Sequence, residues 1–177
     1  MKVIEISELV KDYGKELYNF CRYLTQSKEE ADELYQDTFL KAVEVCDRID
    51  LDHNPKSYLL SIAVKLWKNR KRKYAWRGRI APIEYYSKEL DYGENFLEKG
   101  ETPEEELLKK EKLEMVANAV GCLKEEYRVP MYLYYAANLS LKEISRILHR
   151  PEGTVKSRLY KARGEVKKYL EDKGYGR

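Results

Sequence analysis

Residues 149–163 read HRPEGTVKSRLYKAR, a stretch that interrupts one helical pattern and starts another. Apolar residues return at Val155, Leu159 and Ala162, which share one face of the second helix. The other side carries ammonium and hydroxyl groups: Lys156, Ser157, Tyr160 and Lys161. Lys and Ser side chains can reach the edges of base pairs in the major groove of DNA. The chemistry that this stretch suggests is therefore hydrogen bonding to nucleic acid.

The elements that would position this face form a predicted helix-turn-helix. Ser140 and Glu143 make a capping-box pattern that opens a helix over residues 140–148. Pro151 and Gly153 are expected to stop it and set the turn before a second helix over residues 152–170. Three arginines flank the polar face and could hold phosphates: Arg150, Arg158 and Arg163. On spacing alone, an ordinary helical hairpin with a solvated charged face remains an alternative.

The charge of the chain is sorted into blocks, although the net charge is only +3 over 177 residues. Residues 65–79 hold eight Lys or Arg and no acid, with aromatic residues between them. Residues 84–106 hold nine acids and two lysines, and residues 142–168 hold nine basic residues and three acids. This basic, acidic, basic order favours two nucleic-acid-binding regions separated by an acidic segment.

Several classes of protein are disfavoured by the same sequence. Its three cysteines are far apart and odd in number, which argues for the reducing cytoplasm and for cysteines that act as small core residues. His53 and His149 have no partner at metal-ligand spacing, and no nucleotide-binding loop or Ser/His/Asp set is visible. The start of the chain lacks the long apolar run of a secretory signal. On these grounds we expect no metal and no cofactor.

The long periodic segments all have the period of a helix, and no strand pattern appears. We therefore predict an all-α protein of two small helical domains, covering residues 1–78 and 103–177, joined by a flexible acidic linker over residues 79–102. The predicted helices cover residues 5–24, 28–45, 55 into the basic run, 103 through at least 120, 125–137, 140–148 and 152–170.

Longer motifs carry a resemblance to a known family. The stretch LSLKEISRILHRPEGTVKSRLYKARGEVKKYL resembles region four of a bacterial sigma factor of the extracytoplasmic-function (ECF) type. Upstream, EEADELYQDTFLKA and PKSYLLSIAVKLWKNRKRK are similar to region two of the same family, in the same order. Tyr58 and Lys65 stand where the family usually has Trp and Asn, and both positions bear on −10 preference.

The resemblance implies an alternative sigma factor, which is not an enzyme but binds core RNA polymerase and directs initiation from −10 and −35 promoter elements. Region four would read −35 bases through Lys156, Ser157, Tyr160 and Lys161, and approach phosphates through Arg150, Gly153, Thr154, Arg158 and Arg163. Region two would recognise and melt the −10 element through Asn54, Tyr58, Ser61, Lys65, Lys68, Asn69, Arg70, Arg72 and Lys73. The polymerase clamp would be met by Asp32, Glu33, Gln36, Asp37 and Phe39.

Some roles stay open at this point. Trp67 is read as a core residue in preference to a stacking platform, and the basic run as a DNA surface in preference to a solvated helix end. The acidic segment is either a plain tether or a mimic of nucleic acid inside the polymerase. Tyr132 and Tyr135 are candidates for the polymerase flap or for the core.

The expected partners are core RNA polymerase, through its clamp helices and flap, promoter DNA and an anti-sigma factor. We expect a monomer when free, in the cytoplasm or held at the membrane by the anti-sigma factor. One rival is a stand-alone helix-turn-helix regulator, which would need a dimerisation or sensor domain in place of residues 30–73. Another is a helical structural protein with incidental charge.

Overall fold

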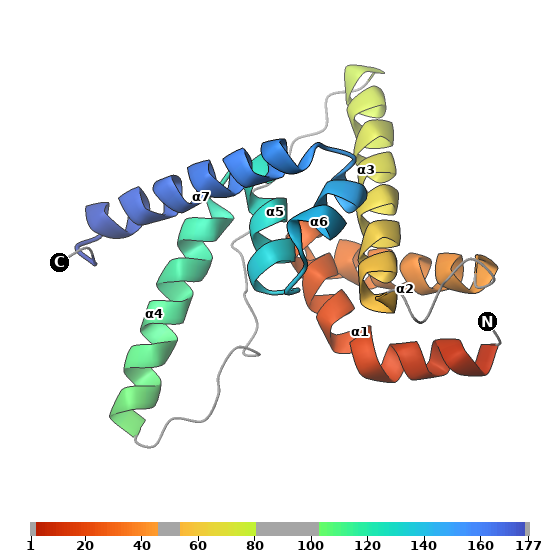
Figure 1. Cartoon of the computed structure of the whole chain (residues 1–177), viewed down its shortest axis with the longest axis horizontal. Helices are drawn as coiled ribbons and strands as arrows, with labels where there is room; N and C mark the ends of the chain where they lie inside the picture. Colours follow the sequence, from red (N-terminus) through yellow and green to blue (C-terminus); the bar gives the residue numbers. More distant parts are fainter. Residues whose placement is uncertain (1–2, 46–53, 81–102, 176–177) are drawn as a thin grey trace. The chain divides into compact units, whose positions relative to one another are not determined.

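The computed structural model describes residues 3–45, 54–80 and 103–175 (Figure 1). Seven α-helices and no strand occur in these ranges, so the predicted all-α fold is confirmed. The helices are α1 (Val3–Thr25), α2 (Lys28–Glu44), α3 (Pro55–Ile80), α4 (Pro103–Gly121), α5 (Glu125–Tyr135), α6 (Leu141–Leu148) and α7 (Glu152–Asp172). No helix within these ranges is long and apolar enough to cross a lipid bilayer. The predicted acidic linker lies mostly outside the described residues.

The helices fall into two compact units. The first unit contains α1, α2 and α3 together with α6, and the second contains α4, α5 and α7. The two helices of the predicted helix-turn-helix therefore belong to different units, and each is described with its own unit.

The first unit is built on a core between α1, α2 and α3. Ser27 caps α2, since its side chain accepts a hydrogen bond from the Glu30 N–H at 3.4 Å. The buried face of α2 consists of Ala31, Leu34, Thr38 and Ala42. Thr38 tolerates this burial because its hydroxyl donates to the Leu34 carbonyl at 2.7 Å.

The positions of Trp67 and of the cysteines can be compared with the expectations from the sequence. Trp67 on α3 is 5% exposed, which confirms it as a core residue. Cys21 on α1 is fully buried, and burial raises the pKa of its thiol to about 12, so it behaves as a small apolar residue. Cys122, by contrast, is exposed, so the expectation of a core position is wrong for that cysteine. Cys46 lies outside the described residues.

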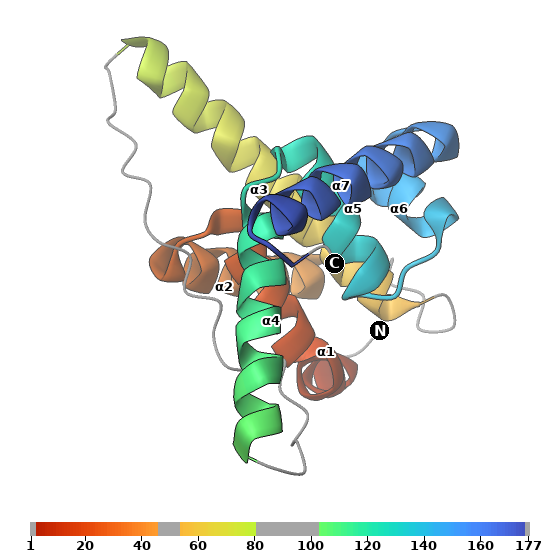
Figure 2. The same ribbon diagram turned by 90° about the vertical axis from the view of Figure 1, so that its left-hand side faces the viewer.

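The second unit packs α7 against α5 and α4 (Figure 2). Its core includes Val129 and Leu133 of α5, which are 4% and 0% exposed. From α7 come Val155, Leu159 and Ala162, all buried, which confirms the predicted apolar face. The spacing of four and three residues places them on one side of the helix, so the opposite side is left to solvent.

The segment between α6 and α7 confirms one prediction and corrects another. Ser140 and Glu143 form the predicted capping box at the start of α6. The end of α6 is set by His149, which has φ 52° in the left-handed region, and not by the proline and glycine that follow. Pro151 precedes the first residue of α7, and Gly153 already lies inside its first turn.

Candidate nucleic-acid interface

The outer face of α7 presents the four residues predicted to read bases. Lys156, Ser157, Tyr160 and Lys161 are all exposed, and Tyr160 has 77% of its surface free. A tyrosine this exposed is unusual, because its ring contributes nothing to the core. The Ser157 hydroxyl donates to the Thr154 carbonyl at 2.9 Å, and its side chain is exposed. These four exposed polar side chains of α7 are therefore available for contacts with the polar surface of another molecule.

The residues predicted to contact −35 phosphates divide into two groups. Arg150 and Gly153 are exposed and Thr154 is half-buried. Arg158 and Arg163 instead contact α5: an Arg158 Nη lies 3.1 Å from a Glu126 carboxylate oxygen, and the Arg163 Nε donates to the Tyr135 hydroxyl at 2.6 Å.

These two contacts tie α7 to its own unit. Arg158 is only 21% exposed, and the Arg163 guanidinium also lies 5.6 Å from the centre of the Tyr135 ring. A guanidinium over a tyrosine face is a favourable cation–π arrangement. Tyr135 is itself 51% exposed and so is not a core residue, whereas Tyr132 is half-buried.

The −10 candidates on α3 form a mixed surface. Lys65, Lys68, Arg72 and Lys73 are exposed, whereas Tyr58, Ser61, Asn69 and Arg70 are half-buried. The Ser61 hydroxyl donates to the Tyr58 carbonyl at 2.7 Å, and an Arg72 Nη donates to Asn69 Oδ1 at 2.8 Å. Arg72 is thus held by a neutral group of its own helix.

Exposed aromatic rings accompany these cations. Trp76 is 65% exposed and Tyr74 is 41% exposed. Trp76 borders a hollow whose other lining residues come from α3 and α2: Asp37, Leu66, Asn69, Arg70, Arg72 and Lys73. An exposed ring beside cations is the combination on which an unpaired base and its phosphate can rest.

Asn54 stands immediately before α3 and is exposed. Its side-chain oxygen accepts from the Ser57 N–H at 3.2 Å, which caps the helix, and its φ of 53° is one that Asn tolerates. Within the first unit its amide also donates to Glu143 at 2.5 Å. Residues 46–53, which precede Asn54, lie outside the described residues.

The acidic residues predicted to face the polymerase lie along α2. Glu33, Gln36 and Asp37 are exposed, whereas Asp32 and Phe39 are half-buried. The Tyr18 hydroxyl donates to Asp32 at 2.8 Å, and this hydrogen bond to a carboxylate raises the pKa of Tyr18 above its usual value.

Two apolar residues of α2 were missed by the sequence prediction. Leu40 is 64% exposed and Val43 is 40% exposed. Leu40 follows Glu33 and Gln36 at helical spacing, so its place on the polar side of the period was the available signal. Neighbouring exposed apolar residues can contribute to a protein–protein contact.

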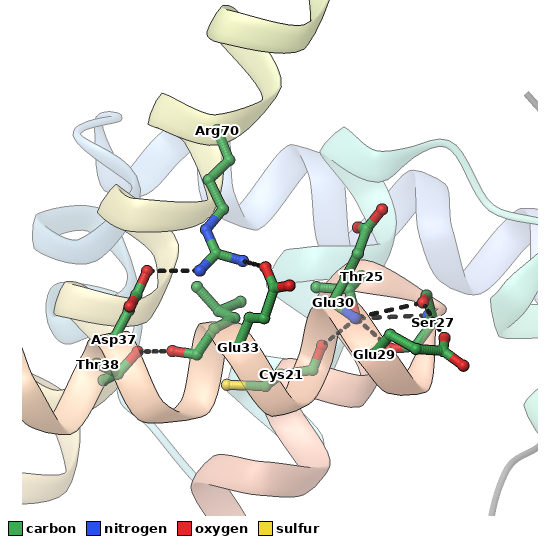
Figure 3. Close-up of polar contacts among 10 residues, drawn as sticks. Cys21, Thr25, Ser27, Glu29, Glu30, Glu33, Asp37, Thr38 and Arg70 are labelled. Carbon is green, nitrogen blue, oxygen red and sulfur yellow. Dashed lines mark hydrogen bonds and ion pairs between the residues drawn. The ribbon is translucent and has the colours of Figure 1, made fainter. Parts of the chain in front are cut away.

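Arg70 joins the two predicted surfaces of the first unit (Figure 3). One guanidinium nitrogen lies 2.5 Å from an Asp37 carboxylate oxygen, and the other lies 3.5 Å from a Glu33 oxygen. A residue predicted to hold DNA therefore contacts two residues predicted to hold the polymerase.

No group of three or more His, Cys, Asp or Glu that could bind a metal occurs among residues 3–45, 54–80 and 103–175.

Two known protein families match the chain, one in each half of the sequence. The sigma-70 region 2 family matches residues 9–77, and the sigma-70 region 4 family matches residues 113–166. The ECF RNA polymerase sigma-E factor of Escherichia coli (strain K12) is 30% identical over 141 residues, covering 76% of this chain and 70% of that protein. The chain belongs to the ECF group of the sigma-70 family. It is an alternative sigma factor that directs promoter-specific transcription.

Other relatives of this sigma factor extend over most of its length. The ECF RNA polymerase sigma factor SigW of Bacillus subtilis (strain 168) is 28% identical over 170 residues, covering 94% of this chain and 89% of that protein. The RNA polymerase sigma-H factor of Pseudomonas aeruginosa is 27% identical over 166 residues, covering 92% and 84%.

Solved structures share the fold. The sigma factor RpoE of Bartonella quintana, crystallised with the anti-sigma factor NepR, matches with a TM-score of 0.79 at 20% identity over 96% of this chain and 98% of that one. CnrH in complex with the cytosolic domain of CnrY matches with a TM-score of 0.63 at 20% identity, over 94% and 88%. The matched region 2 contains α2 and most of α3, and the matched region 4 contains α5, α6 and most of α7.

Proposed function

We propose that this sigma factor binds core RNA polymerase through the acidic face of α2 and promoter DNA through α3 and α7. The proposal rests mainly on α7. Four polar side chains are exposed on the outer face of this helix, and the apolar stripe on its opposite face is buried. Residues 1–78 would act as region two, residues 103–177 as region four, and residues 79–102 as the acidic linker.

At the −35 element, α7 would enter the major groove. Lys156, Ser157, Tyr160 and Lys161 would meet base edges, where a well-made contact is worth about 1–3 kcal/mol of discrimination. Backbone N–H groups at Gly153 lie at the positive end of the helix dipole, which favours a phosphate there. Arg150 and Thr154 would hold the flanking backbone.

At the −10 element, α3 would bind the unpaired strand. Opening a duplex costs about 1.4 kcal/mol per base-pair step, and stacking of a base on an aromatic ring returns about 1–3 kcal/mol. The exposed ring of Trp76 and the cations Lys68, Arg72 and Lys73 support this role. Asn54, Tyr58, Ser61, Lys65, Asn69 and Arg70 would complete the −10 surface.

On the polymerase side, the exposed acids of α2 would meet basic residues of the clamp helices, with Phe39 and the exposed Leu40 adding apolar contact. The flap of the polymerase would contact the second unit near the exposed Tyr135.

Sigma factors are non-enzymatic initiation factors, and we propose that this chain has no catalytic activity, cofactor or metal of its own. An anti-sigma factor would hold it inactive, by analogy with the matched sigma factor RpoE, whose structure was solved with the anti-sigma factor NepR. We further propose that the free protein is a cytoplasmic monomer.

Run-off transcription tests the proposed function. The purified chain and core polymerase are incubated with a library of promoters randomised at both elements, and transcripts are sequenced. We expect transcripts from one class of −35 and −10 sequences only when both proteins are present. Transcription that does not depend on the chain, or that shows no sequence preference, would reject the proposal.

A further inference from the structure

Arg70 lies between the surface proposed to bind the polymerase and the surface proposed to bind DNA. It projects from α3 toward α2, where its guanidinium spans Asp37 and Glu33 (Figure 3). These acids are four residues apart on one helix, so both carboxylates point to the same side. The planar fork of arginine suits two acceptors at once, which a lysine could not match with the same geometry.

The contact is exposed enough to be exchanged. The Arg70 side chain is 23% exposed, and those of Asp37 and Glu33 are 50% and 68% exposed. Ion pairs with this much solvent access are weak individually and are replaced when a better partner arrives. Both acids also belong to the proposed polymerase-facing surface, so basic residues of the polymerase would compete with Arg70 for their carboxylates.

The neighbours of Arg70 are held differently. Arg72 donates to Asn69, a neutral group on the same helix, and Lys73 is exposed. Arg70 is therefore a residue through which a change of partner on α2 reaches the surface of α3. The same hollow is lined by Asp37, Arg70 and Trp76, so a released guanidinium would lie beside the proposed base platform.

We propose that Arg70 couples polymerase docking to DNA binding. In the free protein the acids of α2 neutralise Arg70. When cations of the polymerase engage Asp37 and Glu33, the guanidinium turns to a phosphate of the unpaired strand. Because binding at two coupled sites is reciprocal, DNA held by Arg70 strengthens docking by the same factor. This inference rests on the proposed function and names the residue that links its two surfaces.

The first test mimics docking without polymerase. The full-length variant Glu33→Gln with Asp37→Asn removes both carboxylate charges while keeping their shapes. Its affinity for a fluorescent 20-nucleotide single strand is measured at several salt concentrations. We expect a gain of about three- to tenfold and a salt slope steeper by about 0.7, as one added phosphate contact requires.

The matched control is Glu8→Gln with Asp12→Asn. These acids are also four residues apart and exposed, but they lie on α1. The control makes the same change in net charge, so it measures the general effect of losing two acids. An equal gain from both double variants would overturn the proposal, because the effect would then be long-range charge alone.

The second test removes the arginine. Arg70→Ala is made in the wild-type chain and in the Glu33→Gln, Asp37→Asn background, with Arg72→Ala as comparison. We expect Arg70→Ala to abolish the gain seen in the double variant, whereas Arg72→Ala lowers affinity equally in both backgrounds. A gain that survives Arg70→Ala would overturn the proposal. Far-UV circular dichroism checks that each variant is folded.

Failure of this inference is distinguishable from failure of the proposed function. The wild-type chain is tested separately for binding to core polymerase and for run-off transcription. A chain that binds and transcribes, but whose variants behave like the control, loses only the coupling role of Arg70. A chain that neither binds polymerase nor transcribes loses the proposed function as well.

Discussion

The two helices proposed to contact DNA, α3 and α7, differ in what their arginine side chains contact. On α7, Arg158 and Arg163 contact α5 on one side while the proposed base-reading residues face solvent on the other. On α3, Arg70 contacts α2 while lining the same hollow as the exposed Trp76. In the second unit, the contacts that hold α7 are thus separate from the face proposed to read DNA, whereas in the first unit Arg70 of α3 belongs to both.

The reason lies in how wide the buried stripe of each helix is. In α7 the stripe of Val155, Leu159 and Ala162 is narrow, so arginines beside it reach α5 and leave a broad polar face. In α3 the buried residues include Leu59, Leu60, Ala63, Val64 and Trp67, which cover more of the circumference. Less surface remains, so polar residues of α3 serve two surfaces. We expect substitutions on α3 to affect several steps and those on α7 to affect one.

The largest effect is expected from replacing Lys68, Arg72 and Lys73 together with Ala. The triple variant should keep polymerase binding and lose opening of the −10 element, seen as lost permanganate reactivity of unpaired thymines. Three lost phosphate contacts would flatten the salt dependence of single-strand binding by about two units. Normal opening by this variant would mean that the basic surface of α3 is a solvated helix end.

The next effect concerns base reading by α7. Lys156→Ala should cost about 1–3 kcal/mol at one or two positions of the −35 element and relax the preference there. Binding to a DNA library randomised at the −35 element measures this. The control is Lys167→Ala, which removes an exposed lysine farther along the same helix. A uniform loss at all sequences would contradict a base-reading role for Lys156.

A smaller effect separates the two possible roles of Arg158. If it contacts a phosphate in the complex, Arg158→Ala should weaken all sequences equally and flatten the salt slope by about 0.9. Glu126→Gln removes only the pair within the unit and should leave that slope unchanged. If Arg158 serves only to hold α7 on α5, the two variants should lose similar stability, about 0–1 kcal/mol, with no change of slope. Thermal unfolding and salt titration of both variants distinguish these outcomes.

The smallest effect sets a scale for carboxylate contacts made without arginine. Burial opposes ionisation of Glu143, but hydrogen bonds from Ser140 and Asn54, with Lys56 nearby, outweigh it and lower the pKa of Glu143. Its ionised form therefore stabilises the fold above the usual glutamate pKa, and this contribution is lost as pH falls through the lowered value. Glu143→Gln should cost about 0.5 kcal/mol at pH 7, with the difference shrinking in acid. Urea unfolding at pH 7 and pH 3.5 measures it, and a difference independent of pH would contradict the assignment.

The fold could be predicted closely from the sequence where local signals decide it. The Ser140–Glu143 pair caps its helix as predicted, and the apolar period of α7 matches its buried stripe. The end of α6 could not be read from Pro151 and Gly153, because His149 adopts the left-handed conformation that a helix end more often gives to glycine.

The candidate site was predictable residue by residue but not pair by pair. Exposure of Lys156 and Tyr160 follows from their place on the helix. The contact of Arg70 with Asp37 joins residues 33 apart on different helices, and its existence depends on how α2 and α3 are rotated against each other. That rotation is fixed by packing in three dimensions, and the periodicity of either helix alone does not contain it.

The central claim is that α7 reads the −35 element while the chain is bound to polymerase. Photocross-linking tests it directly: Tyr160 is replaced by p-benzoylphenylalanine in the full chain, which is assembled with core polymerase and promoter DNA. Because Tyr160 lies on the proposed reading face with 77% of its surface exposed, we predict a cross-link to duplex DNA at the −35 element, which disappears when that element is replaced. Cross-links from this position to polymerase alone, or to DNA irrespective of sequence, would contradict the account.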